Sequence, residues 1–306
     1  MKGQNYVPYR YQVFGLSIDS DLEFSELPLR LGSNPDVKIH AGIVPTNLEN
    51  VEKRGKQFQI NRDQCLFFYP KIGSFLVNGG NELVYSILQD ADLDIVRLIL
   101  MGPLLSDLLL RRGMILLHAS AVLVEGQAWL FAGPSGVGKS TTAAILAGDG
   151  QKLISDDVSV IQFSQDEVPQ VYESSPGIKL WEDSFQHLIG SLPVIKKKLV
   201  GKKLDTYEKH VYIFDKQISP SAYPISKIFF LGVGDLIEIT EIKGGAKLAH
   251  LKSNIYGYES FPAYFSDPNI FSNLISISNR CQLYWATHND DLENLIEFRE
   301  LIKNLE

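Results

Sequence analysis

The sequence is poor in cysteine and has no apolar segment at its start. Its 306 residues include two cysteines, Cys65 and Cys281, which lie far apart and without the spacing of metal ligands. Such sparse use of cysteine is typical of a reducing compartment, so we expect a cytoplasmic protein. The first residues, MKGQNYVPYRYQ, contain no hydrophobic signal region, which agrees with this expectation.

The sequence also lacks an uninterrupted hydrophobic run of the length that a membrane helix needs. Its most hydrophobic stretch, residues 95–122, is interrupted by Pro103, by Asp107 and by the pair Arg111-Arg112. A membrane span rarely tolerates such charges. We therefore expect a buried helix followed by a buried strand, and no membrane partner.

An excess of basic residues is absent as well. The chain has 29 Lys and Arg against 36 Asp and Glu, a formal net charge of −7. This balance gives no electrostatic reason to expect a nucleic-acid partner. The 45% of hydrophobic and 21% of charged residues are those of an ordinary globular protein. The length exceeds that of most single hydrophobic cores, so two domains are expected.

Short runs of alternating apolar residues, separated by turns, make up the first part of the chain, from Tyr6 to about Leu88. They predict a small antiparallel sheet, with the sequence NGGN at 78–81 as a hairpin turn. An exposed edge of this sheet is a candidate surface for an extended peptide. We expect an N-terminal β-rich domain over residues 1–90.

The apolar spacing becomes helical from Asp92, and strand-like and helix-like runs alternate beyond Arg112. This alternation indicates an α/β fold, with an amphipathic helix near the end of the chain. We expect a second domain over residues 91–306.

A glycine-rich segment, FAGPSGVGKSTT at residues 131–142, lies between a strand-like and a helix-like run. It matches the phosphate-loop pattern G-x-x-x-x-G-K-[ST] at every fixed position. The backbone N–H groups of such a loop surround phosphates, and the following helix N-terminus favours negative charge. Lys139 is expected to reach the β- and γ-phosphates, and Ser140 to ligate Mg²⁺. The residues expected to contact a nucleoside triphosphate here are Gly133, Ser135, Gly136, Val137, Gly138, Lys139, Ser140 and Thr141.

Three polar residues flank this loop at distances that bear on phosphate chemistry. His118 lies on the preceding strand, and Asp156-Asp157 follow the strand KLIS. Because a strand-loop-helix-strand unit returns beside its first strand, both aspartates are expected near the γ-phosphate. There one carboxylate can orient Mg²⁺ and another can accept a proton from an attacking hydroxyl. Taken singly, the histidine also suits a hydrogen-bonded core position and the aspartates a helix cap or solvated turn.

With His118, the loop GPSGVGKS and Asp156-Asp157 at these spacings, residues 92–235 resemble the catalytic core of bacterial HPr kinase/phosphorylase and its relatives. The resemblance implies an α/β P-loop core of the kind shared with phosphoenolpyruvate carboxykinase. It also implies an ATP- and Mg²⁺-dependent kinase that phosphorylates serine on a peptide or protein. Carried over, the family's roles make Asp156 the base, His118 its partner and Asp157 a metal residue. The family's assembly implies a homo-oligomer.

The sequence departs from the bifunctional members of that family. It has Ala119 after the histidine, where they typically have glycine, and Val158-Ser159 after the aspartate pair, where they have arginine. It has no counterpart of their E-x-R-G-x-G segment, associated with the reverse phosphorolysis. The N-terminal part is more similar to shorter HPr kinase-like proteins associated with ribosomally made peptides. The resemblance therefore implies a kinase-only enzyme whose substrate is a peptide precursor.

Other functional classes remain open or are disfavoured by missing motifs. The chain has no N-K-x-D sequence to recognise guanine, as a GTPase would, and no L-S-G-G-Q-like signature of a transport ATPase. A small-metabolite kinase and a non-transferring ATPase or nucleotide sensor remain alternatives, because a phosphate loop indicates binding and not transfer.

The segment 194–210, VIKKKLVGKKLDTYEKH, is basic and has no clear periodicity. We expect an insertion, either a solvated surface loop or a mobile lid over the phosphates. Lys202 and Lys203 are the lid residues expected to reach the nucleotide.

Overall fold

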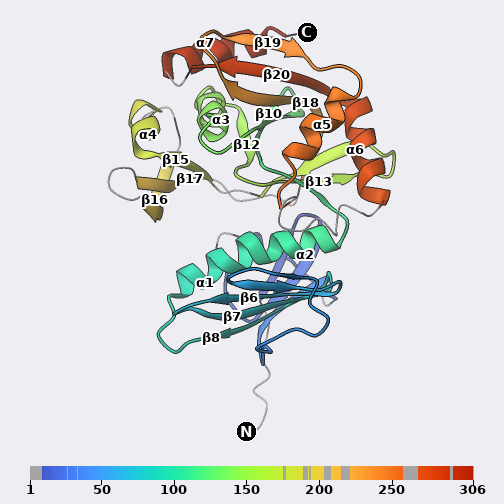
Figure 1. Ribbon diagram of the computed structural model, residues 1–306. Coiled ribbons are helices and arrows are strands. Elements are labelled where there is room, and N and C mark those ends of the chain that lie inside the picture. Colours follow the sequence, from blue (N-terminus) through green and yellow to red (C-terminus); the bar gives the residue numbers. More distant parts are fainter. Residues whose placement is uncertain are drawn as a thin grey trace. The chain divides into compact units, whose positions relative to one another are not determined.

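In the computed structural model the chain forms two compact units (Figure 1). The structure describes residues 9–305 except 26, 33, 175–176, 189–191, 193, 203–207, 215–220, 258–267 and 290–291. The first unit ends at Met114, and the second is formed by the described residues from Ile115 onward.

The first unit contains an eight-stranded sheet in the order β1-β2-β3-β8-β7-β6-β5-β4. Its strands are β1 Tyr9–Val13, β2 Leu16–Ser20, β3 Val37–Ala41, β4 Lys53–Arg54, β5 Phe58–Ile60, β6 Gln64–Tyr69, β7 Gly73–Asn78 and β8 Glu82–Ile87. The expected hairpin turn at 78–81 is confirmed, because it joins β7 to β8. The expectation of a purely antiparallel sheet is wrong, since β3 pairs in parallel with both β2 and β8.

A helical segment follows this sheet and belongs to the first unit. It comprises α1 Leu93–Ile99, a π-helical turn η1 Leu100–Leu104 that contains Pro103, and α2 Leu105–Arg111. Figure 1 shows it along one face of the sheet, and η1 and α2 contact β7. Because the leucines from Leu100 to Leu110 are buried, the compact unit extends to Met114 instead of ending near residue 90.

The outer strands of this sheet do not offer a long open edge. Beside β1, the N–H of Gln12 donates to Pro28 O and that of Arg30 to Arg10 O, so residues 28–30 cover part of the edge. At the other end, β4 is only two residues long. Covered and short edges discourage strand addition, so the sheet edge expected to hold a peptide is not supported.

The second unit is built around a nine-stranded sheet with the path β12-β10-β11-β18-β14-β13-β9, in which β20 pairs with β18 and β19 with β20. Its strands are β9 Ile115–Leu117, β10 Ala119–Val124, β11 Gln127–Ala132, β12 Lys152–Ser155, β13 Ser159–Phe163, β14 Pro169–Tyr172, β18 Ala222–Val233, β19 Glu238–Glu241 and β20 Gln282–His288. Its helices are α3 Lys139–Gly148, α4 Glu182–Leu188, α5 Ala246–Ser253, α6 Pro268–Arg280 and α7 Leu292–Lys303.

The order of the strands around the glycine-rich loop differs from the expected one in two ways. The single strand expected around His118 is divided there: β9 pairs with β13, whereas β10 lies between β11 and β12. The second strand of the loop unit therefore does not lie beside the first. Because β10 is antiparallel to both, β11 and β12 still run in the same direction and their carboxyl ends meet at one edge.

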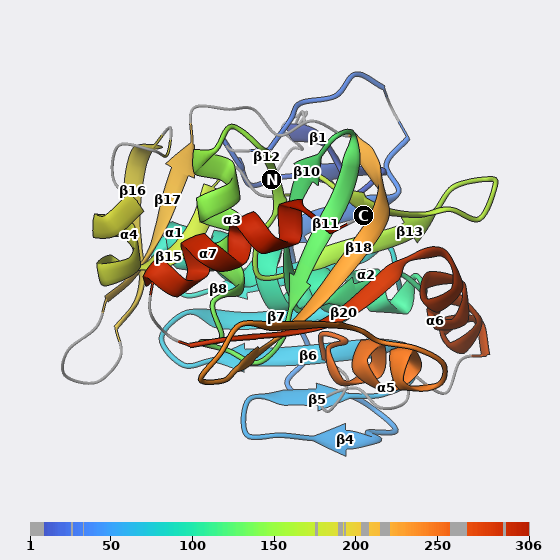
Figure 2. The ribbon, with the colours of Figure 1, turned by 90° about the horizontal axis from the view of Figure 1, so that it is seen from above.

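Alternate residues of the central strand β18 face opposite sides, as the period of a strand requires. Phe229 and Leu231 join a core formed with α3, α4 and α7, whereas Phe230 contacts His250 of α5. Figure 2 shows α3 and α7 side by side, with α5 and α6 apart from them. The expected closing helix is confirmed as α7, whose Phe298 is fully buried.

A three-stranded antiparallel sheet in the order β15-β17-β16 completes the second unit, with β15 Gly177–Trp181, β16 Val194–Lys202 and β17 Glu208–Phe214. The described residues of the segment 194–210 lie in β16 and β17, so the expectation of a solvated surface loop is wrong for them. That the segment acts as a lid stays a prediction. Hydrogen bonds to neighbouring strands hold this segment in extended form, and the alternation of its side chains alone does not reveal such pairing. Among the described helices, none has the length and apolar character needed to cross a membrane.

Phe229 provides a test of this core, since its ring stacks on Phe131 and Tyr284 at centroid distances of 5.4 and 5.2 Å. We expect Phe229→Ala to lower the free energy of unfolding by about 3–5 kcal/mol, because the buried ring is lost and a cavity is left in its place. Urea denaturation followed by circular dichroism measures the change. The control Phe271→Ala removes an exposed ring of the same unit and should shift stability by about 0.5 kcal/mol or less. Equal effects would contradict this description of the core.

Candidate active site

The glycine-rich loop connects β11 to α3 and depends on left-handed backbone conformations. Gly133, Gly136 and Gly138 have φ angles of +145°, +91° and +90°. A Cβ atom at Gly133 would lie 2.7 Å from the carbonyl oxygen of Leu231, so no larger residue fits there. Gly138 precedes α3 and provides no side-chain cap. The first N–H groups of α3 are therefore left without a side-chain acceptor from their cap residue.

Lys139 lies inside the curve of this loop. Its buried ammonium group donates to the carbonyl oxygens of Gly133 and Pro134 at 2.9 and 2.8 Å. Phosphate oxygens are stronger acceptors for an ammonium group than neutral carbonyls. The loop thus holds a cation that can exchange these two contacts for an anionic ligand.

Asp156 connects three separate elements through its carboxylate. Oδ1 accepts from the hydroxyls of Ser120 on β10 and Ser140 on α3, at 2.7 and 2.8 Å. Oδ2 accepts from the backbone N–H of Lys179 on β15 at 2.7 Å. The expected proximity of this aspartate to the loop serine is confirmed, and three donors fix its orientation.

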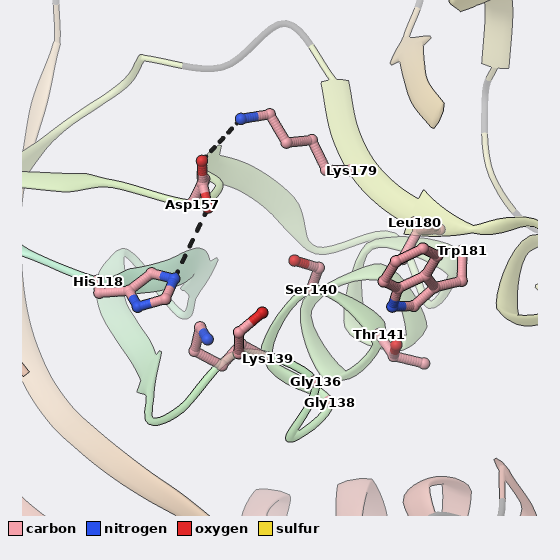
Figure 3. Close-up of a pocket in the computed structure, with 11 residues that line it drawn as sticks. His118, Gly136, Gly138, Lys139, Ser140, Thr141, Asp157, Lys179, Leu180 and Trp181 are labelled. Atoms are coloured by element: carbon pink, nitrogen blue, oxygen red, sulfur yellow. Dashed lines mark hydrogen bonds and ion pairs between the residues drawn. The ribbon is translucent and has the colours of Figure 1, made fainter. Parts of the chain in front are cut away.

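Asp157 points in a different direction from its neighbour. Its φ angle is +72°, in the left-handed region that aspartate tolerates better than most residues. Its carboxylate contacts the Lys179 ammonium at 2.7 Å and lies 3.7 Å from Nε2 of His118 (Figure 3). A left-handed residue between two strands thus separates the two carboxylates onto different partners.

Lys179 lies under the influence of both carboxylates. Burial alone would lower its pKa, but the ion pair with Asp157 and the nearby charge of Asp156 outweigh burial and raise the pKa above its ordinary value. The side chain therefore remains an ammonium ion at neutral pH. It supplies a second cation beside the loop, in addition to Lys139.

These residues line one pocket of the second unit. Figure 3 shows His118 and Asp157 at one end, Ser140 and Lys139 in the middle, and Trp181 with Thr141 at the other end. Ser135, Gly136 and Gly138 line it as well. Asp156 does not line the pocket, and the side chain of Val137 is buried in the core. Lys202 is the last residue of β16, and Lys203 lies outside the described residues.

Sequence reasoning missed four residues of this site. Ser120 could have been predicted, because it lies two positions after His118 in a strand-like run, and alternate residues of a strand face the same side. Lys179 and Trp181 come from β15, whose approach to the loop is a tertiary contact without a sequence pattern. His288 lies at the end of β20, about 150 residues from the loop by the chain.

The side chain of His288 packs against the glycine-rich loop and contacts its backbone. Its buried ring lies with Nε2 3.0 Å from the carbonyl oxygen of Val137 and Nδ1 2.7 Å from that of Asn289. Its Cε1 atom would lie 3.1 Å from a Cβ placed on Gly138. The imidazole therefore packs under the last turn of the loop and holds one of its carbonyls.

The donor set suits Mg²⁺ better than a metal that needs a protein cage. Among the described residues, no three His, Cys, Asp or Glu side chains converge on a point that could hold a metal ion. Mg²⁺ commonly takes one or two protein oxygens and completes its shell with phosphates and water. The Ser140 hydroxyl and the Asp156 carboxylate, already in contact, fit this requirement.

Comparisons with known proteins show a distant likeness of fold. No protein-family model and no curated protein matches the sequence. Among solved structures, the chain is similar to the Hpr(Ser) kinase/phosphatase from Coxiella burnetii, with a TM-score of 0.29 and 10% sequence identity. The comparison covers 62% of this chain and 94% of that chain. This is a distant relationship of fold.

We expect His288→Ala to weaken the binding of magnesium tripolyphosphate about fivefold, because one hydrogen bond of about 1 kcal/mol no longer holds the loop. Isothermal titration calorimetry measures the affinity. His288→Gln keeps a side-chain donor for Val137 O and should lose less. If the alanine variant binds as tightly as the unchanged protein, the loop does not depend on this contact.

Proposed function

We propose that this protein is an ATP-dependent kinase that transfers a phosphoryl group to a serine hydroxyl of a peptide or protein. The observation that carries the proposal is the gathering of the loop residues Lys139 and Ser140, the carboxylate of Asp157 and the imidazole of His118 around one pocket. A pocket with both a phosphate-binding loop and a candidate base suits phosphoryl transfer, which depends mainly on positioning and electrostatics.

In this proposal the glycine-rich loop and the ammonium groups of Lys139 and Lys179 bind the phosphates of the nucleotide. The N–H groups at the start of α3 and the Lys139 ammonium favour phosphate oxygens. Lys179 adds positive charge at the end of the pocket where Asp157 lies. Ser140 and Asp156 would hold Mg²⁺, which neutralises charge on the β- and γ-phosphates.

The contacts of the two aspartates favour an exchange of the roles that the family resemblance implies. Asp156 accepts the Ser140 hydroxyl and does not line the pocket, which suits a metal residue. Asp157 lines the pocket beside His118, which suits a base. We therefore assign the base to Asp157 and metal support to Asp156, the reverse of the sequence prediction.

In this mechanism Asp157 accepts the proton of the serine hydroxyl. The serine oxygen forms a bond to the γ-phosphorus while the bond from that phosphorus to the β–γ bridging oxygen breaks, and ADP leaves. Lys179 contacts this carboxylate at 2.7 Å and holds it beside the phosphate loop. His118 is placed beside Asp157 as a partner for that proton.

The acceptor class rests on the sequence resemblance, and its test is direct. We expect the protein, incubated with ATP, Mg²⁺ and candidate serine peptides, to add one phosphate to serine, as detected by mass spectrometry. Lys139→Ala should abolish transfer, because a loop cation is lost. The control Lys243→Ala changes a lysine with a 78% exposed side chain in the same unit and should leave transfer unchanged.

Three results would contradict parts of this proposal. A phosphorylated small metabolite, with no peptide product, would make the protein a metabolite kinase. ATP hydrolysis that is independent of every acceptor would make it an ATPase. Removal of peptide phosphate by added inorganic phosphate would contradict the kinase-only prediction.

The assignment of the two aspartates is tested by Asp156→Asn and Asp157→Asn. We expect Asp157→Asn to lower transfer about 10²-fold or more with little change in the Mg²⁺ concentration required, since the base is lost while the residues proposed to hold Mg²⁺ are unchanged. Asp156→Asn should raise the Mg²⁺ concentration required. Transfer rates measured across a Mg²⁺ titration distinguish the two variants. The opposite pattern would restore the assignment predicted from the sequence.

A further inference from the structure

Trp181 lies at the end of the pocket opposite the residues proposed for chemistry. Figure 3 shows its indole beside Thr141, across Ser140 from Asp157 and His118. The ring is half-buried, in contrast to Leu180, which is buried in the core. This end of the pocket therefore combines a partly exposed aromatic surface with the start of α3.

Strand β15 accounts for this placement. Lys179 and Trp181 are two residues apart, so they share one face of the strand while Leu180 faces the core. The Lys179 N–H is held by Asp156, which fixes the strand beside the loop. The strand thus sets a cation over the aspartates and an indole about 7 Å farther along.

The pocket also gives a bound nucleotide a direction. Its γ-phosphate belongs at the end with Asp157 and His118, where the acceptor is activated. The β-phosphate belongs at Lys139 and Ser140, in the middle. The nucleoside must then leave towards Thr141, which is the end where Trp181 lies.

We propose that Trp181 is a stacking platform for the nucleobase, a subsite that rests on the proposed nucleotide function. Aromatic rings stack on any base, because every base has a π-face. Recognition by stacking alone does not discriminate adenine from guanine, in keeping with the missing N-K-x-D sequence. The platform therefore accepts both purines with affinities within a few-fold, and pyrimidines more weakly.

The test compares magnesium complexes of ATP, GTP, CTP and inorganic tripolyphosphate, because tripolyphosphate fills the phosphate loop without a base. Calorimetry on the full chain should show that Trp181→Ala weakens ATP and GTP about tenfold and leaves tripolyphosphate unchanged. Trp181→Phe keeps a ring and should lose less. Trp285→Phe changes another partly exposed tryptophan and should have no effect. Retained tripolyphosphate binding also reports that the variant is folded.

Tryptophan fluorescence gives an independent readout. The chain has three tryptophans, and Trp181 is the one that lines this pocket. Trp129 is buried in the core, and Trp285 packs against His250. ATP, but not tripolyphosphate, should quench the emission, and Trp181→Phe should remove most of the quenching.

The outcomes separate the two proposals. No loss for either ligand in Trp181→Ala would overturn the stacking platform and leave the phosphate site intact. Equal losses for ATP and tripolyphosphate would overturn the platform as well, because tripolyphosphate carries no base to stack. A strong preference for one purine would overturn recognition by stacking alone. If the unchanged protein binds neither ATP nor tripolyphosphate, the nucleotide function fails and the platform with it.

Discussion

The carboxylate of Asp156 is the contact on which the arrangement of the site depends. It joins hydroxyls on β10 and α3 to a backbone N–H of β15, so three elements from distant parts of the chain share one acceptor. A charged acceptor that is met by three donors fixes its partners more strongly than a neutral one. Through it, β15 is linked by hydrogen bonds to the loop serine, Ser140.

The sheet topology makes that contact possible. Because β10 lies antiparallel between β11 and β12, the loop that follows β11 and the aspartates that follow β12 emerge at the same edge. The division of the chain at His118 sends β9 to a different part of the sheet and leaves the imidazole at this edge. A buried hydrogen bond between Ser155 and Ser159, at 2.7 Å, closes the turn that carries both aspartates.

Backbone conformations that most residues avoid are concentrated at the site. Gly133 is confined by the carbonyl of Leu231, and Asp157 adopts a left-handed conformation that turns its carboxylate away from that of Asp156. Surrounding packing maintains such conformations where function needs them. Here the result is two adjacent carboxylates with separate partners, which supports separate roles in metal binding and proton transfer.

The sequence by itself determined the local features: the phosphate-loop pattern with its helix from Lys139 to Gly148, the hairpin at 78–81 and the closing helix α7. These depend on turn chemistry and side-chain period, which neighbours along the chain specify. Only the tertiary structure placed β10 between its neighbours, paired the basic segment as strands and brought Lys179, Trp181 and His288 to the loop. Strand order and such approaches depend on hydrogen bonds and packing between residues far apart in the chain, and no local pattern records them.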